Sequence, residues 1–265
     1  MLTTVMKYCM AAVMMFFTGP VWSGPISPSV RAEKIRATPV TIYPGFDVRD
    51  AAFVACFNRF ARTDDALVIS HMEAFKGSFR VADLGVARGQ VWVQVDREAN
   101  LGQSLRKNVE GARGIVFIPD RDQVVSKHSN VRRTASQLAE EAKALGVPLI
   151  VGLDDRDTWS LANVADIARS GDVLTICASS RLHGSVAEYR AHIEKVIRAA
   201  REENPRIKVE LAFIATMAVE DRARMFDLAV ANIDLADRLA IYCDNNQESL
   251  ESLTALLARL RPDGA

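Results

Sequence analysis

Residues 135–153, ASQLAEEAKALGVPLIVGL, contain the pattern that decides the fold. Four apolar residues in this stretch recur at helical spacing: Ala135, Leu138, Ala142 and Leu145. Gly146, followed by Val147 and Pro148, predicts the end of that helix. Residues 148–153 then form a short apolar run of strand length. The stretch therefore predicts a helix that leads directly into a buried β-strand.

The same unit recurs along the chain from residue 38. Eight short apolar runs alternate with amphipathic stretches, at residues 40–43, 66–70, 91–95, 114–118, 148–153, 173–177, 209–214 and 239–242. This alternation is typical of βαβ connections and a parallel sheet. Eight units in about 225 residues is the count and size of a closed barrel. We therefore predict an α/β fold, a single (β/α)8 barrel of the TIM type with parallel strands, over residues 38–265.

A doubly wound open sheet is the main alternative to the barrel. Such sheets usually carry a Gly-rich fingerprint after an early strand, and no GxGxxG motif occurs in this sequence. The weakest unit of the predicted barrel is the second, because residues 73–89 contain three glycines and little helical periodicity. We expect a loop or a single turn there.

The first residues of the chain predict an export signal. Lys7 precedes an apolar run over residues 8–22, and Val21-Trp22-Ser23 offers a cleavage site before Gly24. About 15 apolar residues are fewer than the roughly 20 that span a bilayer. We therefore predict a signal peptide over residues 1–23, a linker over 24–37, a periplasmic or secreted location, and no stable membrane anchor after cleavage.

Composition and cysteine content limit the partners and cofactors. The 265 residues include 33 basic and 33 acidic side chains, so no charge surplus favours a nucleic-acid partner. Without residues 1–23 three cysteines remain, Cys56, Cys177 and Cys243, which allow at most one disulfide. No zinc-type spacing, HxH or HExxH motif occurs. We predict no metal, no other cofactor and no nucleic acid, and expect a small-molecule or polysaccharide ligand.

Alternation along the runs predicts which side chains face the barrel interior. The polar face of each run should point inward, because the other face packs on apolar helix surfaces. The predicted inward set is Thr41, Tyr43, Trp92, Gln94, Asp96, Cys177, Ser179, Glu210, Ala240, Tyr242 and Asp244. Cys243 then points outward, so a bond between Cys177 and Cys243 is not expected.

Acidic side chains dominate the carboxyl ends of the predicted strands, where barrel enzymes carry their sites. The predicted catalytic residues are Asp96, Asp120, Asp154 and Asp244. The predicted substrate-binding residues are Tyr43, His71, Gln94, Ser179, Tyr242 and Asn245. An Asp or Asn after a strand is also a common turn former or helix cap. Because four carboxylates are expected to meet at the same end of the barrel, we favour a catalytic site over four separate turns or caps.

Paired carboxylates beside aromatic side chains are what glycosidic bond cleavage requires. An exported barrel with an acidic mouth resembles glycoside-hydrolase-like barrels in general, although Glu residues do not end the fourth and seventh runs here. The hypothesis is an exported glycoside-hydrolase-like barrel that acts on a carbohydrate. The alternative is a non-catalytic exported barrel that binds a sugar or another polar ligand. A Schiff-base lyase or aldolase is disfavoured, because none of the eight runs ends in Lys.

Overall fold

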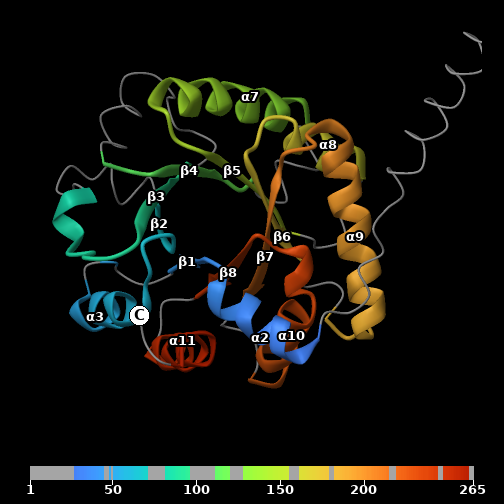
Figure 1. Cartoon of the computed structure of the whole chain (residues 1–265). Coiled ribbons are helices and arrows are strands. Elements are labelled where there is room, and N and C mark those ends of the chain that lie inside the picture. Colours follow the sequence, from blue (N-terminus) through green and yellow to red (C-terminus); the bar gives the residue numbers. More distant parts are fainter. Residues whose placement is uncertain are drawn as a thin grey trace, which may run out of the picture.

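A closed barrel of eight parallel strands forms the centre of the molecule (Figure 1). The structure, a computed structural model, describes residues 27–44, 48, 50–70, 81–95, 111–119, 128–154, 161–178, 182–214, 219–243 and 247–262. The strands are β1 (Val40–Tyr43), β2 (Ala66–Ser70), β3 (Gln90–Gln94), β4 (Gly114–Phe117), β5 (Leu149–Asp154), β6 (Val173–Cys177), β7 (Lys208–Ile214) and β8 (Arg238–Tyr242). Each strand pairs with the next in the chain, and β8 closes the ring on β1. The predicted parallel (β/α)8 barrel is confirmed.

Helices lie around the outside of this barrel (Figure 1). The α-helices of the described residues are α2 (Pro28–Ala37), α3 (Ala51–Phe60), α7 (His128–Leu145), α8 (Leu161–Ala168), α9 (Val186–Glu203), α10 (Val219–Ala231) and α11 (Gln247–Leu260). Two short 3-10 helices, η1 (Val81–Leu84) and η3 (Ile233–Leu235), complete the connections. In the second unit the described part of the connection holds only η1, which agrees with the single turn expected there.

Local sequence signals explain where two of the helices begin and end. Ser185 caps α9: its hydroxyl accepts from the Glu188 amide at 3.1 Å, and its own amide donates to the Glu188 carboxylate at 2.7 Å. Gly146 follows the end of α7 with a φ of +69°, a left-handed conformation that glycine adopts without strain. Helix α7 itself begins at His128.

The register of the strands places the expected inward side chains on one face. Thr41 is level with Ala240, Tyr43 with Tyr242, and Thr175 with Glu210. Residues at the same level of a parallel sheet point to the same side. The opposite face is apolar and buried against the helices: Val91, Val93, Leu239 and Ile241 are all buried. The predicted inward orientation is confirmed where the residues are described.

The segment before the first strand is helical for most of its described length. Residues 28–37 belong to the predicted linker, and they form α2, whose first turn is capped by the Ser27 hydroxyl. Lys34 Nζ of this helix donates to the Asp234 carbonyl at 3.1 Å, so α2 contacts η3. The predicted signal peptide lies outside the described residues and stays a prediction. Among the described helices, none combines the length and hydropathy that membrane crossing requires.

Candidate functional site

A fully buried carboxylate, that of Glu210, lies inside the barrel. It belongs to β7, where inward residues alternate with apolar residues that face the helices. Glu210 Oε1 accepts from the Thr175 hydroxyl at 2.8 Å and from the Tyr43 hydroxyl at 3.3 Å. Glu210 Oε2 accepts from the Thr41 hydroxyl. Hydroxyl groups from β1 and β6 therefore satisfy both oxygens of a carboxylate that water does not reach.

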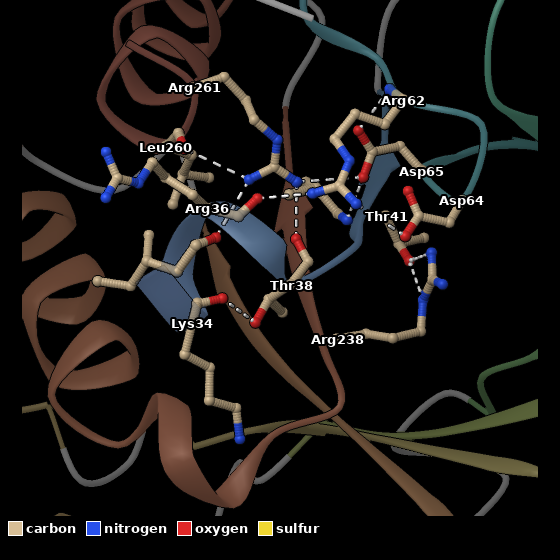
Figure 2. Close-up of polar contacts among 12 residues, drawn as sticks. Lys34, Arg36, Thr38, Thr41, Arg62, Asp64, Asp65, Arg238, Leu260 and Arg261 are labelled. Carbon is tan, nitrogen blue, oxygen red and sulfur yellow. Dashed lines mark hydrogen bonds and ion pairs between the residues drawn. The ribbon is translucent and has the colours of Figure 1, made fainter. Parts of the chain in front are cut away.

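Arg238 supplies the opposite charge from the first residue of β8. Its Nε lies 3.4 Å from Glu210 Oε2, and its Nε and Nη2 each donate to the Thr41 hydroxyl oxygen at 3.2 Å. Figure 2 shows the Arg238 side chain directed at Thr41. The guanidinium also lies over the Trp92 ring, 4.6 Å from its centroid. Arg238 therefore faces a buried carboxylate whose two oxygens both accept hydrogen bonds.

Two tyrosines occupy the carboxyl-terminal side of Glu210. Tyr43 and Tyr242 end β1 and β8, and their rings stack with centroids 4.3 Å apart and planes 16° from parallel. Burial raises the pKa of Tyr43 well above its usual value, and the negative charge of Glu210 raises it further. Burial likewise raises the pKa of Tyr242, with smaller contributions from Tyr43, Cys177 and Glu210. Both phenols therefore keep their protons at neutral pH.

The Tyr43 hydroxyl extends the hydrogen bonds of Glu210 toward Tyr242. Tyr43 donates its proton to Glu210 at 3.3 Å, and its ring stacks on the ring of Tyr242. The oxygen of Tyr43 can still accept a proton. Tyr242 is partly exposed, whereas Tyr43 is buried. The order Tyr242, Tyr43, Glu210 thus leads from the carboxyl-terminal end of the barrel to its buried centre.

Only part of the predicted site lies in the described part of the chain. Tyr43 and Tyr242 are brought into direct contact. Gln94 ends β3 and is half-buried on the inward face, and Asp154 ends β5 with its backbone level with Cys177. The remaining predicted site residues, His71, Asp96, Asp120, Ser179, Asp244 and Asn245, lie outside the described residues. Their catalytic or binding roles stay predictions.

Sequence reasoning missed Glu210 and Arg238 as site residues. Glu210 was expected to face inward but was not placed in the site, and Arg238 directly precedes the eighth predicted run. The available signal was a single acidic residue within the otherwise apolar run 209–214. A charge in such a position needs a buried partner, and this requirement points to a polar cluster inside the barrel.

The described thiols and acidic groups add no second centre. Cys56, Cys177 and Cys243 are not joined in disulfides, and Cys243 directly follows the inward Tyr242 and therefore points away from the interior, as predicted. Within the described ranges, no cluster of three or more His, Cys, Asp or Glu residues has a geometry that could hold a metal ion.

Comparisons with known proteins identify the fold. No protein-family model and no curated protein matches this sequence. Among solved structures, a putative deoxyribose-phosphate aldolase from Toxoplasma gondii ME49 superposes with a TM-score of 0.52 at 13% identity, over 89% of this chain and 97% of that one. An orotidine 5'-monophosphate decarboxylase from Methanocaldococcus jannaschii gives 0.49 at 10% identity, over 83% and 97% of the two chains. An aldolase called QR15 gives 0.46 at 13% identity, over 84% and 94%.

The prediction of a glycoside hydrolase is wrong. The structure from Toxoplasma gondii, with the TM-score of 0.52, is described as an aldolase, and aldolases belong to a different enzyme class from glycoside hydrolases. The hypothesis rested on an exported barrel with an acidic rim, and such a rim is a feature of the fold that many barrel chemistries share. The expected small-molecule or polysaccharide ligand is not tested by these comparisons and stays a prediction. At 13% identity the similarity shows the fold and assigns no activity to this chain.

Proposed function

We propose that this chain is a barrel enzyme that moves a proton to and from a small polar substrate at the carboxyl-terminal end of the barrel. The observation that carries the proposal is the stacked pair of Tyr242 and Tyr43, in which Tyr43 donates to the buried carboxylate of Glu210. Tyr242 is the partly exposed member, so it is the group that would contact the substrate. The chemistry is that of isomerases and lyases that form an enolate next to a carbonyl group.

The relay balances without any further reactant. A substrate C–H proton passes to Tyr242 Oη, the Tyr242 proton passes to Tyr43 Oη, and the Tyr43 proton passes to Glu210. The electron pair of the C–H bond remains on the substrate as an enolate, and the reverse transfer returns the proton to carbon. Phenols with raised pKa values serve as carriers because they are neutral before and after the transfer.

A Schiff-base route finds no support in the described strands. Such a route needs a Lys near the carboxyl end of a strand. The described strands contain one lysine, Lys208, and it is the first residue of β7, at the opposite end of the barrel. The aldolase described among the similar structures is consistent with carbonyl chemistry in general, and the proposed relay here is an acid–base version of it.

The first experiment measures hydrogen exchange at carbon. The full chain is incubated in D2O with pyruvate, dihydroxyacetone and glyceraldehyde, and loss of the α-proton signal is followed by NMR. We expect exchange above the buffer rate for at least one probe. Tyr242→Phe should lower that rate by about 100-fold, because it removes the proton carrier that contacts the substrate.

Tyr189→Phe is the matched control. Tyr189 is buried in α9, away from the barrel interior, and loses the same hydroxyl group. It should exchange at the wild-type rate. No exchange of any probe by the wild type, or equal rates for Tyr242→Phe and wild type, would contradict the proposal. Inactivation by borohydride in the presence of a probe would instead indicate a Schiff base.

A further inference from the structure

A cavity lies at the amino-terminal end of the barrel. Its volume is about 720 Å³ and it opens to solvent. Its lining includes Gln90, Lys208 and Arg238, which are the first residues of β3, β7 and β8. The cavity is therefore at the opposite end from the tyrosine pair, and its size is within the range of small-molecule sites.

Positive charge is in excess on the lining of this cavity. Lys208 and Arg206 are exposed there, and within the described residues neither side chain forms an ion pair. Arg238 forms part of the inner wall, with its side chain 12% exposed. Asp172 and Asp237 also line the cavity, but each already binds a backbone amide, of Leu149 at 2.8 Å and of Val209 at 2.9 Å. These hydrogen bonds orient the two carboxylates toward the strand starts, and both acids keep their negative charge. The lining therefore carries three cations against two carboxylates, and the two exposed cations can reach a ligand.

Apolar groups complete the lining. Pro39, Val147, Pro148 and Val173 lie around the cations. A site with this mixture suits a molecule that has an anionic group and a carbon skeleton. Bare inorganic ions are much smaller than the cavity and would leave its apolar surface in contact with water.

We infer that this cavity binds a small organic anion, a carboxylate or a phosphate ester, through Lys208 and Arg206. Both side chains are long and solvated, so they can close on an oxygen of the ligand with charge-assisted hydrogen bonds. Arg238 adds positive potential from the inner wall while it remains paired with Glu210. Binding here is separate from the proposed proton relay, and its test does not depend on catalysis.

The test is calorimetric titration of the full chain with malate and with glycerol 3-phosphate, with glycerol as the uncharged control. We expect saturable binding of at least one anion and none of glycerol. The double variant Arg206→Gln/Lys208→Gln should weaken binding by about tenfold or more, since it removes two charged donors. Arg238 is not substituted, because its removal would leave the buried carboxylate of Glu210 without its ion-pair partner.

The matched control is Lys195→Gln/Arg198→Gln. It removes the same charge from two exposed positions of α9 that do not line the cavity. This variant should bind within about twofold of the wild type. Equal weakening in both double variants would show a general charge effect and overturn the inference. So would the absence of saturable binding of either anion by the wild type at about 10 mM.

Discussion

Two buried carboxylate–arginine pairs in this barrel have the same N···O distance but different hydrogen-bond donors around the carboxylate. Asp65 and Arg261 approach to 3.4 Å, as do Glu210 and Arg238. Backbone amides hold Asp65: Oδ1 accepts from Val40 at 2.6 Å and Oδ2 from Arg62 at 2.8 Å. Side-chain hydroxyls hold Glu210. A backbone amide can only donate, whereas a hydroxyl can turn and can pass its proton on.

The arginines differ in the same way. Arg261 is 4% exposed and donates to the backbone carbonyl of Thr38 at 2.7 Å (Figure 2). It also donates to the carbonyl of Ile35 at 3.1 Å. It thereby ties the residue after α11 to the end of α2 and the approach to β1. Arg238 is 12% exposed and contacts a hydroxyl, a carboxylate and an aromatic ring. The first pair is therefore a structural clamp at the amino-terminal end, and the second is suited to function.

The largest effect is expected for Asp65→Asn. An amide can accept only one of the two backbone N–H groups, and Arg261 is left as a buried cation without its partner. The free energy of unfolding should fall by about 3–5 kcal/mol, measured by urea titration. A loss of less than about 1 kcal/mol would show that the clamp is not needed.

Glu210→Gln should be less costly, at about 2 kcal/mol. The hydroxyls of Thr41, Thr175 and Tyr43 can turn to accept from the new NH2 group, and water can reach Arg238 from the amino-terminal cavity. The same urea titration gives the comparison. A larger loss than for Asp65→Asn would reverse the distinction between the two pairs.

Gly114→Ala tests the packing of the Trp92 ring against Arg238. A Cβ at Gly114 would lie 2.8 Å from the Trp92 ring, so the indole must shift. Because the Arg238 guanidinium lies over that ring, we expect a loss of about 1–2 kcal/mol and a change in tryptophan fluorescence. Unchanged fluorescence and stability would show that Trp92 adjusts without strain.

The smallest effect concerns Asp234 and Arg190, a pair nearer the surface. Partial burial acts to raise the pKa of Asp234. The two hydrogen bonds from Arg190, at 2.8 and 3.0 Å, the positive charge of Arg190, a backbone hydrogen bond and the charge of Lys34 together outweigh burial and hold the pKa below its usual value. A lowered pKa gives stability that is present above the unfolded pKa and lost as the pH falls through the folded one. Asp234→Asn should lose about 1 kcal/mol at pH 7.

That loss should shrink as the pH falls below about 3.9, the usual pKa of an aspartate. Urea midpoints of the wild type and Asp234→Asn at several acidic pH values measure it. A difference that stays constant down to about pH 3 would show that the Asp234 charge has no part in the stability.

The sequence predicts the barrel well because alternation and strand length repeat eight times. The bounds of β1, β2 and β6 agree with the predicted runs, and the others differ by one residue at one or both ends. Inward residues such as Tyr43 and Tyr242 follow from the same two-residue period.

The polar cluster could not be predicted in the same way. Thr175 and Arg238 are the register partners of Glu210 on the neighbouring strands, and Thr41 joins them from β1 across the closed barrel. The register between strands is not encoded in any one run. Arg261 and Asp65 are 196 positions apart in the chain, and no local pattern links them. The sequence therefore predicts which face each residue occupies but not which partner it meets.

The most direct test of the relay is the ionisation of its two tyrosines. The protein is labelled with [13Cζ]tyrosine, and the signals of Tyr43 and Tyr242 are assigned with Tyr43→Phe and Tyr242→Phe. The account predicts that neither signal titrates near the usual pKa of about 10. It also predicts that Glu210→Gln lowers the pKa of Tyr43, because a negative neighbour is removed. Ionisation of both tyrosines at about pH 10, or a Tyr43 pKa that ignores the Glu210 substitution, would contradict it.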